Sequence, residues 1–269
     1  MIPSSSVHDA GDCRFFLFDK EDVISDSLRN NLGHDPHVVL IAAMFLDHYL
    51  RIGEPGHVLD IGANVGSFCV PLAQKYPQFT FHAFEPQRIV FYQLCSNILL
   101  NRCDNVFANN FGLSYQPDSF YIEVPDYSTE SNVGAFSLDN EVRQNDYECH
   151  PGGNSELISV IQLDNMQINN ISLIKIDVEG LELAVLVGAK NTIERNGFPP
   201  ILFEAWADKE WFQPRRQELF SYIESLGYEI TTIGQDNLAQ HSSRKVLEID
   251  VREVNKDCVP NLIPEIPEA

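Results

Sequence analysis

The chain has 269 residues, of which 44% are hydrophobic and 21% charged, and this balance predicts one globular domain of medium size with a substantial core. Its formal net charge of -21 argues against nucleic acid and anionic membranes as partners, because binding to phosphate groups depends on Lys and Arg. The six cysteines form no CxxC pair and no zinc-type spacing, so we expect reduced thiols.

Residues 1–33 are predicted to form an N-terminal extension, polar and irregular except for 14–18, which could be an edge strand or a hydrophobic clamp. They contain no basic segment followed by an apolar core, so no secretory signal is predicted. From Asp35-Pro36 onward, apolar residues recur at helical spacing and predict a helix. Its apolar run at 38–46 is far below the roughly 20 residues needed to span a bilayer, so we expect a cytoplasmic protein without membrane insertion.

The segment 58–67, VLDIGANVGS, predicts a strand, a tight turn and the start of a helix. Gly62 and Gly66 suit a backbone that turns sharply at the carboxyl end of a strand. Such a turn leaves helix N–H groups and the acid Asp60 beside a crevice. In open α/β sheets, this crevice usually holds a nucleotide-like ligand.

Alternating strands and helices follow this turn. A second strand at 79–84 ends in Glu85, and a third is predicted at 105–110. The helix between them, 87–101, is predicted to bury one face made of Ile89, Tyr92, Cys95, Ile98 and Leu99. This order predicts parallel βαβ units.

The segment 114–156 interrupts the alternation and is too long for an ordinary connection. It contains one predicted strand, at 120–124. A loop of this size at a sheet edge is commonly a lid or a substrate wall, while a disordered acidic insertion fits the composition equally well. His150 would be a candidate base if the insertion folded over a site, whereas His34 and His37 precede a helix and are expected at the surface.

The alternation then resumes towards the carboxyl terminus. Helices are predicted at 181–196 and 214–226. The predicted strands are 157–163, 172–177, 201–204 and a terminal antiparallel pair at 228–233 and 246–251. No internal repeat is visible, and no pattern in the chain indicates an oligomeric state.

Four predicted strands end in an acid, namely Asp60, Glu85, Asp177 and Glu204. Because ligands in open α/β sheets bind outside the carboxyl ends of the strands, these acids form one candidate site. The alternative is that each acid caps the following helix or is simply solvated.

Two ligands compete for the glycine turn. The dinucleotide pattern G-x-G-x-x-G requires glycines at 62, 64 and 67, but this chain has Asn64 and Ser67. S-adenosyl-L-methionine has no phosphate, and it offers an amino group, a ribose diol and a sulfonium. Asp60 suits the amino group, directly or through water, and Glu85 suits the ribose hydroxyls. The glycine pattern therefore favours S-adenosyl-L-methionine over NAD.

Three segments together resemble the FkbM-type family of S-adenosylmethionine-dependent methyltransferases. They are VLDIGANVG at 58–66, IKIDVEGLE at 174–182 and VLVGA at 185–189, with a weaker match at 160–164. The second segment is the most specific of them. The similarity runs from about residue 36 to residue 205.

The resemblance implies a Rossmann-like class I α/β fold, with a seven-stranded mostly parallel sheet, helices on both faces and an antiparallel terminal strand. The methyltransferase domain would occupy 34–252, with the insertion or lid at 114–156 and an acidic, proline-containing tail at 253–269. The implied activity is methylation of a hydroxyl on a saccharide or another small molecule. The implied cofactor-binding residues are Asp60, Gly62, Ala63, Asn64 and Gly66 around the methionine part, Glu85 at the ribose, and Asn110 or Asn109 at the adenine amine.

Methyl transfer to an alcohol requires an in-line geometry and removal of the hydroxyl proton. Asp177 ends a central strand and Glu179 follows two residues later, so both are candidate catalytic acids together with Glu204. Neighbouring carboxylates raise each other's pKa and make a better base; alternatively, Asp177 and Glu179 cap the helix that begins near Gly180. Their oxygens would suit Mg²⁺ or Ca²⁺, but no metal site is assigned.

Trp206 and Trp211 are expected to pack in the core, although stacking on a sugar ring is the other possibility. Two rival functions are an NAD-dependent oxidoreductase and a methyltransferase-like domain that has lost activity and serves in protein interactions. The missing glycines argue against the first rival. The retained strand-end acids argue against the second.

Overall fold

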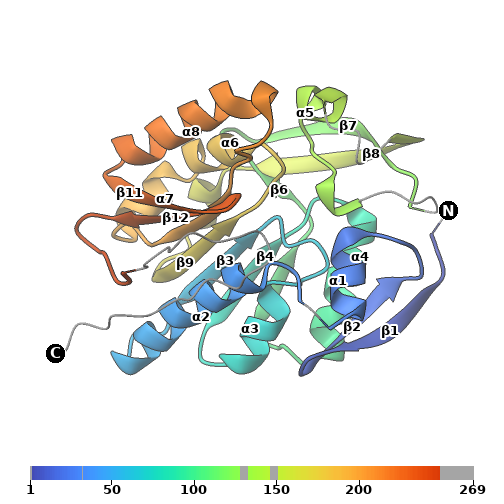
Figure 1. Cartoon of the computed structure of the whole chain (residues 1–269), viewed down its shortest axis with the longest axis horizontal. Helices are drawn as coiled ribbons and strands as arrows, with labels where there is room; N and C mark the ends of the chain where they lie inside the picture. Colours follow the sequence, from blue (N-terminus) through green and yellow to red (C-terminus); the bar gives the residue numbers. More distant parts are fainter. Residues whose placement is uncertain (1, 32, 128–132, 146–150, 249–269) are drawn as a thin grey trace.

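A seven-stranded sheet forms the centre of the computed structural model, which describes residues 2–31, 33–127, 133–145 and 151–248 (Figure 1). The strand order is β11-β12-β10-β9-β3-β4-β5. In that order the strands are Tyr228–Ile233, Asp236–His241, Ile201–Glu204, Ile171–Ile176, His57–Ile61, Thr80–Phe84 and Val106–Asn109. Only β12 is antiparallel to its neighbours, β10 and β11. This arrangement confirms the predicted class I fold with its antiparallel terminal strand.

Helices cover both faces of this sheet (Figure 1). On one face lie α2 Pro36–Arg51, α3 Cys69–Lys75 and α4 Arg88–Leu100, and on the other α6 Glu182–Val187, α7 Lys190–Arg195 and α8 Gln213–Ser225. Alternate residues of β3 point to opposite faces of the sheet. Val58 packs in the core on the side of α2, α3 and α4, and Leu59 packs in the core on the side of α6, α7 and α8. Strands buried on both faces read as continuous apolar runs, which is why the central strands could be predicted.

The N-terminal residues are more regular than the sequence predicted. Strands β1 Ser5–Ala10 and β2 Cys13–Phe18 form an antiparallel hairpin, followed by α1 Val23–Arg29. The hairpin is held on α4, because the N–H of Phe16 donates to Asn97 Oδ1 at 2.6 Å and the N–H of Arg14 donates to Asn101 Oδ1 at 2.8 Å. The prediction of an irregular segment outside 14–18 is therefore wrong.

Because of this contact, the buried face of α4 differs from the predicted one. Tyr92 and Leu99 were expected inside, but they are 52% and 78% exposed. Gln93 and Asn97 are buried instead, because their amides bind backbone groups of the hairpin strand β2. Polar side chains on the inner face are invisible to a search for apolar periodicity.

The long insertion forms a second, three-stranded sheet with strand order β6-β8-β7. Its strands are β6 Gly112–Leu113, β7 Asp118–Pro125 and β8 Pro151–Ile161, and the segment between β7 and β8 includes the 3₁₀ turn Val133–Ala135 and α5 Asn140–Asn145. The predicted strand at 120–124 lies within β7. The predicted strand at 157–163 is confirmed for 157–161, which belong to β8, whereas Leu163 begins the 3₁₀ turn Leu163–Met166.

The single helix predicted at 181–196 is two helices, α6 and α7. The chain breaks at Gly188, where a Cβ would lie 2.0 Å from the backbone oxygen of Ser114. Asp164 then binds the start of α7, accepting from the N–H of Thr192 at 2.6 Å. A third 3₁₀ turn, Glu210–Phe212, leads into α8 as predicted.

The last strand also lies at a different position from the predicted one. β12 begins two residues after β11, beyond a turn in which Gly234 has φ +70°. Its polar sequence DNLAQH concealed it, and the predicted strand at 246–251 is wrong for 246–248, which form no strand. Residues 249–251, the tail at 253–269 and His150 lie outside the described residues.

Cys13, Cys69, Cys95 and Cys103 are free thiols, and the other two cysteines also lie outside the described residues. Within the part of the chain that the structure describes, no helix is both long and apolar enough to cross a membrane.

Candidate active site

A cavity of about 460 Å³ opens at the carboxyl ends of β3, β4, β9 and β10. Six of the predicted site residues line it: Gly62, Asn64, Glu85, Asp177, Glu179 and Glu204. The other predicted residues, Asp60, Ala63, Gly66 and Asn110, do not line it. The fold thus brings the glycine turn and the candidate catalytic acids to one cavity.

The glycine turn is fixed between the two neighbouring strands. Gly62 has φ +82°, and a Cβ there would lie 1.7 Å from the backbone oxygen of Asp177. The N–H groups of Gly62 and Ala63 donate to the carbonyl of Phe84 at 3.1 and 2.9 Å. On the other side, the N–H of Asp177 donates to the carbonyl of Ile61 at 2.9 Å. Only glycine satisfies this close approach between β3 and β9.

Glu85 is held rigidly at the end of β4. Its two carboxylate oxygens accept hydrogen bonds from the N–H groups of Asn64 at 3.1 Å and Gln87 at 2.8 Å. Asn64 adopts φ +49°, which turns its N–H towards this carboxylate. Burial raises the pKa of Glu85 to about 7. The carboxyl group faces the cavity in one fixed orientation, ready to bind hydroxyl groups.

Lys175 was not predicted as a site residue, but it connects the two motifs. Its Nζ lies 3.4 Å from Asp60 Oδ1, 3.2 Å from Asp177 Oδ2 and 3.0 Å from the carbonyl oxygen of Gly62. Burial opposes its charge, but Asp177 and Asp60 outweigh burial and raise the pKa of Lys175 above its usual range. Lys175 and Asp177 are two residues apart along an extended segment, so their side chains point to the same face of the sheet. This spacing alone could have predicted Lys175 as a neighbour of Asp177.

Asp60 is fully buried behind Lys175. Burial raises the pKa of Asp60, and the neighbouring Lys175 ammonium partly offsets this. An unpaired buried carboxylate would be costly. The structure therefore places Asp60 where it neutralises Lys175 and holds it beside the turn.

Asp177, Glu179 and Glu204 come close together on the β9–β10 side of the cavity. One carboxylate oxygen from each lies within 4.8 Å of those of the other two. Burial, followed by the charges of Asp177 and Glu179, raises the pKa of Glu204 well above its usual value. Glu204 is consequently protonated more readily than an ordinary glutamate and can donate a hydrogen bond.

Glu182 holds the loop between β9 and α6. Its Oε1 accepts from the N–H groups of Val178 at 3.2 Å and Gly180 at 3.1 Å. It is 2% exposed, and burial raises its pKa to about 7. Glu182 therefore fixes the loop that carries Glu179, and both Asp177 and Glu179 line the cavity.

The model of the methyltransferase FkbM domain matches residues 60–230. The chain belongs to this family. The match spans the glycine turn, Glu85 and the strand-end acids, and it confirms the resemblance predicted from the sequence. It also argues against the rival function of an NAD-dependent oxidoreductase, as the missing glycines did.

Three curated methyltransferases are similar to this FkbM-domain chain. "Methyltransferase 1" of Beauveria bassiana is 30% identical over 150 residues, which are 50% of this chain and 59% of that protein. "Methyltransferase sdnD" of Sordaria araneosa is 28% identical over 225 residues, covering 70% and 80%. The "31-O-demethyl-FK506 methyltransferase FkbM" of Streptomyces tacrolimicus is 29% identical over 177 residues, covering 56% and 68%. Among solved structures, the chain is similar to the Pyrococcus abyssi tRNA (uracil-54, C5)-methyltransferase. The two share 11% sequence identity and superpose with a TM-score of 0.44, and the match covers 87% of this chain and 43% of that chain.

The cofactor of the FkbM family is S-adenosyl-L-methionine, and the residues on the cavity wall fit it. Glu85 presents a fixed carboxyl group for a ribose diol. The acids on the β9–β10 side suit the positive sulfonium, whereas they would repel the pyrophosphate of a dinucleotide. The residues on the cavity wall therefore favour S-adenosyl-L-methionine over NAD, as the glycine pattern did.

The two asparagines after β5 are occupied by backbone groups. Asn110 Nδ2 donates to the carbonyls of Glu85 at 2.9 Å and Pro86 at 3.2 Å. Asn109 Nδ2 donates to the carbonyl of Ala83 at 3.2 Å. Neither residue lines the cavity, so a contact with adenine stays a prediction.

The insertion and the aromatic residues complete the wall of the FkbM-domain cavity. Gly134, Phe136 and Leu138 of the insertion line it. Trp206 also lines it, but it is 4% exposed and packs against Phe212 and Trp211. The prediction of core packing is confirmed for Trp206, whereas Trp211 is partly buried against the same cluster.

Proposed function

We propose that this FkbM-domain protein transfers a methyl group from S-adenosyl-L-methionine to a hydroxyl of a saccharide or another small molecule. One observation carries the proposal: Glu85 and the acids Asp177, Glu179 and Glu204 line the same cavity, from adjacent parts of one sheet edge. The Streptomyces relative is named for a substrate that lacks a methyl group on an oxygen, which supports an oxygen acceptor.

The proposed roles follow from position and protonation. The cofactor lies across the ends of β3 and β4, where Glu85 accepts hydrogen bonds from the ribose hydroxyls. The acceptor lies over the ends of β9 and β10, and its hydroxyl points in line with the methyl carbon and the sulfur. S-adenosyl-L-methionine supplies the electrophilic methyl group, and the chain supplies orientation and a proton acceptor.

Asp177 is the base that we favour, with Glu179 beside it. The raised pKa of Glu204 favours its protonated form, which can donate a hydrogen bond. Glu204 would then orient the acceptor oxygen. Lys175, 3.2 Å from Asp177 Oδ2, positions the base.

The test is methyl transfer from S-adenosyl-L-methionine that carries a ¹³C methyl group, offered to matched pairs of hydroxyl and amine acceptors on sugar and small-molecule scaffolds. NMR of the products separates O-methyl from N-methyl signals. We expect O-methyl products, and Asp177→Asn should abolish them while binding of S-adenosylhomocysteine is retained. Transfer to nitrogen or carbon only would contradict the proposal, and binding of the cofactor without transfer to any acceptor would favour an inactive interaction domain.

A further inference from the structure

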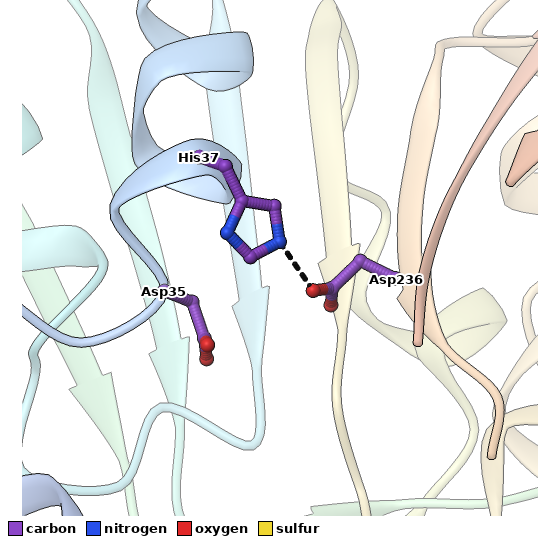
Figure 2. A group of neighbouring side chains, drawn as sticks. All are labelled: Asp35, His37 and Asp236. Atoms are coloured by element: carbon purple, nitrogen blue, oxygen red, sulfur yellow. Dashed lines mark hydrogen bonds and ion pairs between the residues drawn. The ribbon is translucent and has the colours of Figure 1, made fainter. Parts of the chain in front are cut away.

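Asp35, His37 and Asp236 form a second group of titratable side chains at the edge of the cavity (Figure 2). His37 Nε2 lies 2.6 Å from Asp236 Oδ2, and one potential ligand atom from each of the three residues lies within 4.8 Å of those of the other two. Asp35 and Asp236 line the cavity. None of these residues was predicted to belong to a site, and His37 was expected at the surface.

Two distant parts of the chain create this group. Asp35 and His37 begin α2, and Asp236 begins β12, 199 residues after His37. Asp35 occupies the N-cap position, where an aspartate usually accepts a hydrogen bond from a helix N–H. Here it has φ +46° and makes no capping bond. Its carboxylate lies below the His37–Asp236 contact in Figure 2, and His34 Nε2 lies 3.1 Å from its Oδ2.

The group carries an excess of negative charge. Asp236 stands directly opposite Glu204 in the antiparallel pairing of β10 and β12, and like charges in that position destabilise a sheet. Among the described residues, neither Asp35 nor Asp236 forms an ion pair with a lysine or arginine. A bound cation would compensate both carboxylates.

We propose that Asp35, His37 and Asp236 bind a divalent first-row transition metal, such as Mn²⁺ or Zn²⁺, at the edge of the cavity. One imidazole nitrogen and two carboxylate oxygens are a ligand set that these ions accept, whereas Mg²⁺ and Ca²⁺ prefer oxygen alone. Metal–ligand bonds of about 2.0–2.2 Å place the ligand atoms about 3–4 Å apart. The His37–Asp236 pair would open slightly and the ion would replace the proton between them.

The neighbouring group of Asp177, Glu179 and Glu204 is the less suitable site for a cation. The Nζ of Lys175 already lies 3.2 Å from Asp177, so an ammonium competes for that carboxylate. The Asp35–His37–Asp236 site lies on the same cavity, and its remaining coordination positions would be open to water or to an oxygen of the acceptor. The metal site does not depend on methyl transfer.

The test is titration of the full chain with Mn²⁺, followed by electron paramagnetic resonance. We expect one site, with a nitrogen coupling from the imidazole in pulsed spectra. His37→Gln should remove the nitrogen coupling, and both His37→Gln and Asp236→Asn should weaken binding by about tenfold or more. Glu204→Gln is the matched control on the adjacent strand and should keep the nitrogen coupling.

Three outcomes would overturn the proposal. The first is the absence of Mn²⁺ binding to the folded chain. The second is binding without a nitrogen coupling, and the third is binding that Glu204→Gln abolishes but Asp236→Asn leaves unchanged, which would place the ion on the other acids. Thermal unfolding of each variant in the absence of metal shows whether the variant is folded, and binding is compared among folded variants only. If Asp236→Asn does not fold, His37→Gln and its lost nitrogen coupling decide the question.

Discussion

The two sides of the cavity are built in different ways. On the β3–β4 side, close backbone contacts set the geometry, and the carboxyl group of Glu85 is held by two N–H groups. On the β9–β10–β12 side, Asp177, Glu179, Glu204 and Asp236 converge, and Lys175 is the cation that pairs with one of them. The first side is rigid and locally satisfied, whereas the second carries mutually repelling charges.

We infer from this difference that the β3–β4 side binds the cofactor and that the β9–β10–β12 side takes part in methyl transfer. A preorganised wall binds a cofactor with little reorganisation. A wall of acids is costly in the free protein, but it favours a positive sulfonium and offers groups that accept or donate protons. Substitutions on the first side should therefore affect stability and cofactor affinity, and substitutions on the second should affect transfer.

Gly62→Ala should produce the largest effect. The added Cβ would lie 1.7 Å from the backbone oxygen of Asp177, and we expect a loss of more than about 4 kcal/mol in the free energy of unfolding. The measurement is urea denaturation. Gly53→Ala is the control, because Gly53 also has a positive φ (+75°) but nothing within 4 Å of its Cβ position, so it should cost only about 1–2 kcal/mol. Equal losses in the two variants would show that the backbone contact does not matter.

Lys175→Met should be the next most damaging change. It removes the cation that pairs with the fully buried Asp60, and breaking a buried pair costs about 3–5 kcal/mol. The double variant Lys175→Met with Asp60→Asn should recover part of this loss, because no uncompensated charge is left. Strict additivity of the two single changes in a denaturation cycle would refute the coupling.

Stability should also depend on pH through the buried glutamates. The pKa of Glu85 is raised from 4.5 to about 7, so the folded chain keeps a proton that the unfolded chain releases. This contribution is fully present below pH 4.5 and is lost as the pH rises through 7, with a total of about 3 kcal/mol. Glu85→Gln should flatten the profile of unfolding free energy against pH across this window. The exposed Glu54→Gln is the control, and identical profiles for Glu85→Gln and the wild type would contradict the pKa assignment.

Asn64→Gly should have the smallest effect. The φ of +49° is one that glycine adopts freely, and the N–H bond to Glu85 remains, so stability should change by less than about 1 kcal/mol. Affinity for S-adenosylhomocysteine should stay within about threefold of the wild type. Asn64→Val should be worse in both assays, because a β-branched residue is strained at positive φ. A large loss with Asn64→Gly would mean that the asparagine side chain itself binds the cofactor.

The sequence was most informative where local geometry imposes residue types. The glycine turn and β10, Ile201–Glu204, were predicted because a sharp turn requires glycine and buried parallel strands are continuously apolar. The site residues that were missed depend on packing between distant segments. Lys175 was overlooked although it shares a face with Asp177, and the contact between His37 and Asp236 spans 199 residues.

Two further elements escaped prediction for a related reason. The hairpin β1–β2 is fixed by amide side chains in and directly after α4. In β12, the amides of the buried Asn237 and Gln240 donate to backbone carbonyls. Patterns of apolar residues do not register such hydrogen-bonded contacts.

Calorimetric titration with S-adenosylhomocysteine tests the separation of the two sides most directly. We expect the wild type to bind one equivalent, Glu85→Gln to bind about 10- to 100-fold more weakly through the loss of hydrogen bonds to a carboxylate, and Glu204→Gln to bind within about threefold of the wild type. Equal weakening by both substitutions, or no binding to the folded wild-type chain, would contradict the account.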